Sequence, residues 1–241
     1  MRSPAHAASR LGNLRAGPIG VGEVHTWIAD LAVLDSTALL DRNVLDPAEL
    51  DRAARYARPR DGARFAAIRA CLRLILESYL DKDPADLRFA ASPSGRPALA
   101  GDDLGKLEFS LSRSGDLALI AVSLTPVGAD IEIVRARAGL ADVIASRFSA
   151  AEARCILAGC GGSPVRGFYR HWTAKEAYLK ATGCGLAGLR GTELACGRPD
   201  VIRVDGAPAD GWTLSLPQAA PGAAMAIVGG GPVTQYRRVR Q

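Results

Sequence analysis

The most informative segment of the chain is Val127-Gly-Ala-Asp-Ile-Glu-Ile-Val134, whose branched, alternating residues predict a β-strand. Side chains of a strand point alternately to its two faces. Gly128, Asp130 and Glu132 therefore share one face, and the apolar residues share the other. By itself this alternation is typical of an antiparallel strand with one solvated face.

The spacing of the two acids also permits a sharper interpretation. Residues two apart on a strand have Cα atoms about 6.5–7 Å apart. Two carboxylates about 6 Å apart in a partly screened site repel each other by about 2–3 kcal/mol. Water relieves this repulsion on a solvated face, and a divalent cation relieves it in a binding site. Because Mg²⁺ takes carboxylates together with substrate phosphates, Asp130 and Glu132 are candidate metal ligands.

A second segment, residues 168–181, has helical spacing. Trp172 lies on an apolar stripe, whereas Glu176 and Lys180 lie on a neighbouring polar stripe. An ordinary i,i+4 pair of Glu and Lys contributes only about 0.2–0.5 kcal/mol. Of the 30 Lys and Arg residues in the chain, 26 are Arg, so lysine is rare. Lys175 and Lys180 nevertheless both lie in this segment. A compact ammonium suits a phosphate oxygen beside a metal, so the segment is either a plain amphipathic helix or part of a phosphate site.

Composition limits the alternatives. The chain has 241 residues, 48% of them hydrophobic, which is enough for a buried core. No apolar run reaches the roughly 18 residues of a membrane span, and the first twenty residues lack the apolar region of a secretory signal. Five cysteines without a C-x-x-C pair, three histidines and no G-x-S-x-G motif argue against a zinc hydrolase or a Ser-His-Asp enzyme.

Other phosphate and nucleic-acid signatures fail or are weak. The G-x-G-x-x-G pattern at 183–188 follows a helix instead of a strand, and residues 101–107 are one residue short of a P-loop. The net charge of +5 is compatible with an anionic partner. The arginine-rich segment 52–73 keeps a basic nucleic-acid-binding protein without catalysis as an alternative, although no aromatic pattern accompanies it.

The predicted fold class is α+β. We expect two similar halves related by a pseudo-twofold axis, each a small antiparallel sheet packed on a long helix, with the active site in the cleft between them. The predicted divisions are a flexible N-terminal tail over 1–22, an N-terminal half over 23–124, a C-terminal half with the metal site over 125–230, and a C-terminal tail over 231–241.

Local signals predict where elements begin and end. Asp46 with Glu49, and Ser149 with Glu152, have the spacing of capping boxes at helix starts, and Gly183 is placed to end the helix over 168–181. A long helix is expected over 61–80. Strands are expected over 23–33, 87–90, 107–112, 117–124, 127–134, 212–216 and 224–228.

Taken together, the acidic strand and the lysine helix resemble the 4′-phosphopantetheinyl transferases of the larger, surfactin-synthetase-activating type. The family's strand pattern G-[IV]-D-[IV]-E stands here at residues 128–132, and its helix pattern W-[ST]-x-K-E-[AS]-x-x-K stands at residues 172–180. Residues 94–97 resemble its G-[KR]-P element, and residues 109–114 its F-N-x-S-H-S element. The resemblance covers about residues 23–230.

The resemblance implies transfer of 4′-phosphopantetheine from coenzyme A to a serine of an apo acyl, peptidyl or polyketide carrier protein. Adenosine 3′,5′-bisphosphate would be released. It implies that Asp130, Glu132 and Glu176 hold Mg²⁺. Lys175 and Lys180 would act as catalytic and cofactor-binding residues that steady the phosphate charge.

The resemblance also implies a nucleotide site. The residues that would hold the nucleotide and its 3′-phosphate are Arg52, Arg64, Arg96, Ser112 and Arg113. Glu152 matches an acid that deprotonates the carrier serine directly or through water. Arg113 stands where the family usually has His, and Ser110 stands where it often has Asn.

We expect a cytoplasmic monomer that activates carrier proteins of secondary metabolism and binds neither nucleic acid nor a membrane. A third possibility is a fatty-acid-type carrier synthase that works as an oligomer. The chain of 241 residues is too long for the usual small trimer of that kind.

Overall fold

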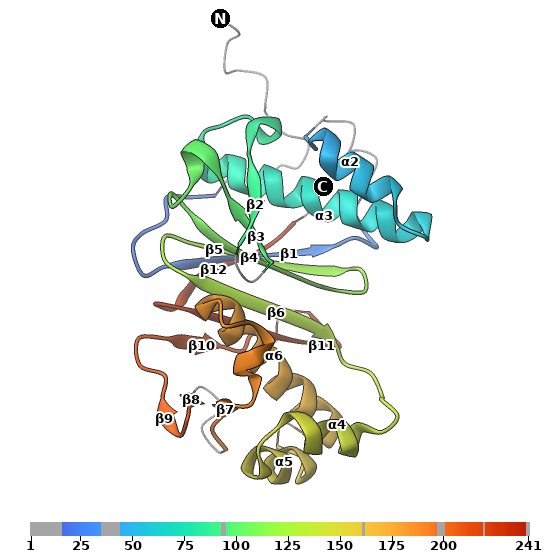
Figure 1. Ribbon diagram of the computed structural model, residues 1–241, viewed down its shortest axis with the longest axis vertical. Coiled ribbons are helices and arrows are strands. Elements are labelled where there is room, and N and C mark those ends of the chain that lie inside the picture. The colour runs from blue at the N-terminus through green and yellow to red at the C-terminus, as the bar shows by residue number, and fades with distance from the viewer. Residues whose placement is uncertain are drawn as a thin grey trace, which may run out of the picture.

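The computed structural model describes residues 16–34, 44–92, 95–160, 162–196, 201–218 and 220–239 (Figure 1). The helices are α2 (Pro47–Ala54), α3 (Pro59–Leu80), α4 (Leu140–Arg147), α5 (Ala150–Leu157) and α6 (Pro164–Thr182), with short 3-10 helices at Pro84–Asp86, Gly101–Asp103 and Gly185–Leu189. The strands are β1 (Val24–Asp30), β2 (Phe89–Ala91), β3 (Pro97–Leu99), β4 (Glu108–Ser114), β5 (Leu117–Ser123), β6 (Val127–Ile133), β7 (Thr192–Leu194), β8 (Ile202–Val204), β9 (Ala207–Pro208), β10 (Thr213–Ser215), β11 (Ala223–Gly229) and β12 (Val233–Arg238).

The first large sheet has the strand order β12-β1-β5-β4. β1 runs antiparallel to β5 and parallel to β12. Helix α3 lies along this sheet (Figure 1) and buries Ile68, Leu72 and Ile75 against it together with Trp27 of β1. These residues form one contiguous core, which fixes the long helix on the sheet.

The second sheet has the strand order β10-β11-β6 and is antiparallel throughout. Helix α6 packs on it at unusually close range. A Cβ atom added to Gly128 of β6 would lie 1.8 Å from the carbonyl oxygen of Ala177 on α6. Only glycine permits this approach of two backbones, so the first residue of the acidic strand motif sets the distance between β6 and α6.

The two sheets face each other across a separate apolar cluster. Val24 and Ile28 of β1 and Leu119 of β5 meet Ala129 and Ile131 of β6 in this cluster. The resulting order of layers is helix, sheet, sheet, helix (Figure 1). The predicted α+β class is confirmed. The pseudo-twofold relation of the halves stays a prediction.

Local signals predicted helix ends well. Both capping boxes are present, with Asp46 Oδ1 accepting from the Glu49 N–H at 2.9 Å and Ser149 Oγ accepting from the Glu152 N–H at 3.2 Å. Gly183 ends α6 with a φ of 73°, in the left-handed region. α3 begins at Pro59 and α6 at Pro164, earlier than predicted, because proline is favourable in the first turn of a helix.

The chain termini differ from the prediction. β12 pairs in parallel with β1, so the predicted C-terminal tail over 231–241 is wrong along this strand. Its polar residues alternate between half-buried and exposed at a sheet edge, which gives little sequence signal. Of the predicted tail over 1–22, residues 1–15 lie outside the described residues, and Ala16 and Ile19 contact the first core.

Two further features were not expected. Helix α4 and the small sheet β7-β8-β9 lie in segments that carried no clear pattern. The predicted boundary at 124/125 falls between β5 and β6, which belong to different sheets. Of the helices in the described ranges, none combines the length and apolarity that crossing a membrane requires.

Candidate active site

Strands β4 and β6 meet where the two large sheets adjoin, and serine side chains join them. Ser110, Ser112 and Ser114 alternate along β4 and therefore share one face. Ser110 Oγ accepts a hydrogen bond from the Ala129 N–H at 2.9 Å. Ser114 Oγ accepts one from the Ile133 N–H at 3.1 Å. Serine side chains of β4 thus bind backbone N–H groups of β6, in the way that backbone carbonyls of a neighbouring strand would in a sheet.

Asp130 lies in the middle of this junction and is only 4% exposed. Its Oδ1 accepts hydrogen bonds from Ser112 Oγ and from Lys180 Nζ, each at 2.7 Å. Lys180 also donates to the Ala129 carbonyl oxygen at 3.1 Å. The second oxygen, Oδ2, is buried and has no hydrogen-bond partner among the described residues. Because a buried acceptor without a partner is costly, this oxygen is available to a ligand.

Glu132 and Glu176 bring two more acids to the same place from β6 and α6. Glu132 Oε2 accepts a hydrogen bond from Ser114 Oγ at 2.6 Å. Burial raises the pKa of Glu176, and the negative charges of Asp130 and Glu132 raise it further, while Lys180 opposes them. Glu176 of α6 is therefore within electrostatic reach of both acids of β6.

The donor chemistry of this group fits Mg²⁺. In the described part of the chain, no three His, Cys, Asp or Glu side chains stand in an arrangement that by itself holds a metal ion. The carboxylates of Asp130, Glu132 and Glu176 nevertheless supply the oxygen donors that Mg²⁺ prefers. The buried, unpartnered Oδ2 of Asp130 is the specific observation that supports the fit.

Lys175 and Glu152 form a separate, fully buried ion pair, and each side chain is 1% exposed. Lys175 Nζ donates to Glu152 Oε2 at 2.9 Å and lies 4.9 Å from the centre of the Phe148 ring. Glu152 Oε1 accepts from the Leu194 N–H at 2.9 Å. Both carboxylate oxygens of Glu152, the predicted base, therefore accept hydrogen bonds within the protein.

A cavity of about 500 Å³ lies on the outer side of β4 and carries arginines. We call it the arginine cavity and define it by Arg52, Arg69 and Arg113 together with the rings of Phe65 and Phe89. The Arg69 guanidinium lies 4.3 Å from the centre of the Phe89 ring. Asp46 and Glu49 also line the cavity, and Glu49 pairs with Arg69, so the cations left for a ligand are Arg52 and Arg113. Two arginines beside aromatic rings are suited to a nucleotide.

The predicted nucleotide-binding residues divide between different places. Arg52 and Arg113 line the arginine cavity. Arg64 instead pairs with Asp116, with an N–O distance of 2.6 Å. Arg96 lies between two residues of the cavity wall and is partly buried, and burial lowers its pKa. Ser112 points to Asp130 on the opposite face of β4 from Arg113.

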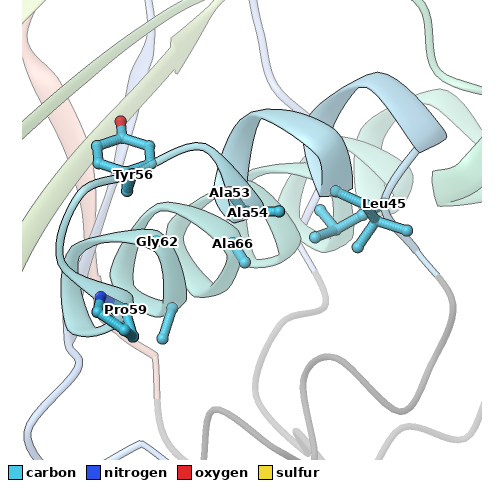
Figure 2. A pocket seen from close by; sticks show the side chains of 9 residues that line it. Leu45, Ala53, Ala54, Tyr56, Pro59, Gly62 and Ala66 are labelled. Carbon is cyan, nitrogen blue, oxygen red and sulfur yellow. The ribbon is translucent and has the colours of Figure 1, made fainter.

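A second cavity, of about 440 Å³, lies between α2 and α3 (Figure 2). Leu45, Ala53, Ala66 and Pro59 give it an apolar wall, and Tyr56 separates it from the arginine cavity because it lines both. Among the described residues, those that line this cavity include no Lys, Arg, Asp or Glu, the side chains on which phosphate chemistry depends.

Sequence reasoning missed three residues near the candidate site. Arg69 was not assigned to the nucleotide, and Ser110 and Ser114 were read only as parts of a motif. The alternation of serines at 110, 112 and 114 was the available signal. This alternation has a functional meaning only because β4 lies beside β6, and the sequence of β4 alone does not show that contact.

Comparisons with known proteins identify the family. A family model described as the 4′-phosphopantetheinyl transferase superfamily matches residues 126–225, which include β6 and α6. The 4′-phosphopantetheinyl transferase HetI of a Nostoc species is 36% identical over 214 residues, covering 87% of this chain and 89% of its own. The 4′-phosphopantetheinyl transferase Sfp of Bacillus subtilis is 28% identical over 144 residues, covering 59% and 62%.

The extent of the match to the Nostoc enzyme settles the class. The chain belongs to the 4′-phosphopantetheinyl transferase superfamily, as its two motifs predicted. A phosphopantetheinyl transferase of a Thraustochytrium species, 28% identical over 81% of this chain and 74% of its own, extends the likeness to a further relative. The predicted enzyme class is confirmed.

Proposed function

We propose that the protein transfers 4′-phosphopantetheine from coenzyme A to a serine hydroxyl of an apo carrier protein in a Mg²⁺-dependent reaction. The serine oxygen forms a bond to the β-phosphorus of coenzyme A, and the bond from that phosphorus to the bridging diphosphate oxygen breaks. Adenosine 3′,5′-bisphosphate leaves with the bridging oxygen, and the serine proton passes to a base.

The convergence of three acids at the β4–β6 junction carries this proposal. Asp130 and Glu132 come from β6 and Glu176 from α6. Burial raises the pKa of Glu176, and the charges of Asp130 and Glu132 add to this effect. A bound Mg²⁺ would supply charge neutralisation for the diphosphate. Lys180, which is 20% exposed and already contacts Asp130 Oδ1, is placed to contact a phosphate oxygen at the same site.

The nucleotide of coenzyme A would occupy the arginine cavity. Arg52 and Arg113 would bind its phosphates, and Phe65 and Phe89 would contact the base. Arg113 lies on the same strand as Ser112, one residue away, so β4 would have nucleotide on one face and the metal site on the other. Arg96 would contribute positive potential beside the cavity, whereas a role for Arg64 would require it to leave Asp116.

The deprotonation of the carrier serine involves Glu152 in this proposal. Its Oε2 accepts bonds from Lys175 and Ser149, whereas Oε1 accepts only that of Leu194 and has a lone pair left. Because the Glu152 side chain is only 1% exposed, the serine proton would reach Oε1 through water. Lys175 then holds Glu152 in place, and the predicted contact of Lys175 with phosphate would require this buried pair to open.

A Glu152→Gln variant separates a base from a purely structural residue. If Glu152 takes the proton, kcat falls and the acidic limb of its pH profile disappears while the variant remains folded. If only the ion pair matters, the melting temperature falls and the shape of the pH profile stays as in the unchanged protein. Circular dichroism of the same sample controls for folding.

We further propose that the enzyme works as a monomer in the cytoplasm on acyl, peptidyl or polyketide carriers of secondary metabolism. All five cysteines are free, as expected in a reducing compartment. The resemblance to the surfactin-synthetase-activating type supports the choice of carriers.

The direct test is incubation with coenzyme A, Mg²⁺ and a panel of apo carriers, followed by intact-mass measurement. We expect a gain of about 340 Da on at least one carrier, from the formula of the transferred group. A matched carrier with its acceptor serine changed to alanine should gain nothing. Absence of any gain across the panel, with a salt-sensitive shift of DNA or RNA instead, would support the nucleic-acid alternative.

A further inference from the structure

We infer that Ser112 and Ser114 are positioning residues: each binds one oxygen of an acid on β6 and leaves the other oxygen for the cation. This inference rests on the proposed metal site and adds the residues that fix its geometry. It assigns to β4 a role that is separate from nucleotide binding on its opposite face.

The direction of the Ser114 hydrogen bond follows from its partners. A serine hydroxyl has one hydrogen to donate and two lone pairs to accept. Its oxygen lies 3.1 Å from the Ile133 nitrogen, which donates, and 2.6 Å from Glu132 Oε2, which only accepts when ionised. The single hydroxyl hydrogen must therefore point to Glu132. The backbone N–H of Ile133 on β6 thus orients the Ser114 hydroxyl, and that hydroxyl orients the Glu132 carboxylate.

Ser112 does the same for Asp130. Its hydroxyl donates to Oδ1 at 2.7 Å, and Lys180 donates to the same oxygen. Both donors bind Oδ1 of Asp130, and its Oδ2 is buried without a partner among the described residues. For Glu132 the bond to Ser114 likewise uses Oε2 alone. In both acids one oxygen is held by β4 and the other is left for a ligand.

The support matters most for Glu132. Asp130 is buried and held by two donors, whereas Glu132 is half-buried at the end of β6 and carries a longer side chain with more rotamers. Without Ser114 its carboxylate would be free to turn to water. Partners that orient metal-binding side chains typically change metal affinity by 10–100-fold when removed.

The test is a titration with Mn²⁺, followed by its electron paramagnetic resonance signal, in the full chain with coenzyme A present. We expect Ser114→Ala to weaken Mn²⁺ binding about tenfold. Ser114→Thr should bind nearly as the unchanged protein because it keeps the hydroxyl. Ser114→Cys, which keeps the size but donates only weakly, should resemble Ser114→Ala and provides a second removal of the bond.

Ser110→Ala is the matched control. Ser110 lies on the same face of β4 and bonds β6, but its partner is the Ala129 backbone instead of a carboxylate. This variant should lower the melting temperature and leave Mn²⁺ affinity unchanged. If it weakens Mn²⁺ binding as much as Ser114→Ala does, the serines act only by holding the strands together, and the inference is overturned.

The remaining outcomes are also decisive. Unchanged Mn²⁺ affinity in both Ser114→Ala and Ser114→Cys overturns the positioning role. No Mn²⁺ binding by the unchanged protein removes the proposed metal site and the inference with it. Normal Mn²⁺ binding and the expected serine effects, but no loading of any carrier, would contradict the proposed reaction alone.

Discussion

Two buried charge clusters, one between α2 and α3 and one at the β4–β6 junction, use acids and cations in opposite ways. In the first half, Glu49 lies between Arg69 and Arg73, and Arg73 Nη2 also binds Asp46 Oδ2 at 2.7 Å. Acids and arginines are matched, and Arg73 is fully buried. At the β4–β6 junction three acids share Lys180, and a buried oxygen has no partner among the described residues.

The difference separates structure from function. A buried ion pair whose members are all satisfied holds local elements together, here α2 on α3. An excess of negative charge in a buried place destabilises the protein unless a cation offsets it. We therefore assign the matched cluster mainly to the fold, with Asp46, Glu49 and Arg69 also forming part of the wall of the arginine cavity, and the unmatched cluster to metal binding. Substitution of the fully buried Arg73 and substitution of the acids at the β4–β6 junction should therefore have different readouts.

The largest expected effect is on the stability of the matched cluster. Arg73→Met leaves the Glu49 and Asp46 carboxylates without their buried partner and should lower the free energy of unfolding by about 3–5 kcal/mol. Urea denaturation measures this change. Carrier loading per folded molecule should persist below the melting temperature. A loss of loading without a loss of stability would break the comparison.

The next effect is on activity. Asp130→Asn keeps the size of the side chain but removes its charge, and it should reduce carrier loading about 100-fold, equivalent to about 2.7 kcal/mol. The melting temperature without metal should change little, since Asn can still accept from Ser112. Initial rates at saturating coenzyme A and Mg²⁺ provide the measurement. Loading at the rate of the unchanged protein would remove Asp130 from the metal site.

Gly128→Ala tests how the unmatched cluster is assembled. The added methyl group would collide with the Ala177 carbonyl oxygen, and overpacking of this kind costs about 1–3 kcal/mol. Because β6 must move away from α6, the acids of the two elements should separate and Mg²⁺ affinity should fall. Thermal melts with and without Mg²⁺ measure both effects. A stable variant with full Mg²⁺ affinity would contradict the close approach of β6 and α6.

The smallest effect concerns pH and involves one histidine in each half. Burial lowers the pKa of His25 and of His171 below the ordinary value of 6.5. Near pH 6.5 these histidines therefore bind protons in the unfolded chain but remain neutral in the folded chain. The free energy of unfolding should decrease as pH falls below 6.5. Denaturation curves between pH 7.5 and pH 5 should show this slope, and His171→Asn should reduce it. A variant with the same slope would exclude His171 as a contributor.

Local sequence signals predicted much of the fold. The caps at Asp46, Ser149 and Gly183 depend on neighbours within a few residues, and each is present. β12 was missed because its partner β1 is about two hundred residues away in the chain and its own residues are mostly polar. Parallel pairing at such a distance leaves little trace in either segment alone.

The candidate site divides in the same way. The acids at 130, 132 and 176 were predictable because each carries its motif in a short segment. The roles of Ser112 and Ser114 depend on β4 lying beside β6, and the place of Glu152 depends on its bonds to Lys175 and to the Leu194 backbone. Those contacts join different elements, so no local pattern records them.

The central claim is that Asp130, Glu132 and Glu176 are held together in order to bind one divalent cation. The most direct measurement is the melting temperature of the unchanged protein and of Glu176→Gln, with and without Mg²⁺ and coenzyme A. Without metal, Glu176→Gln should be at least as stable as the unchanged protein, since it removes a negative charge whose burial, together with the nearby charges of Asp130 and Glu132, raises the pKa of Glu176. Coenzyme A alone should stabilise both proteins through the arginine cavity, and addition of Mg²⁺ should further stabilise the unchanged protein but not the variant. Equal stabilisation of both proteins by Mg²⁺ would contradict the claim.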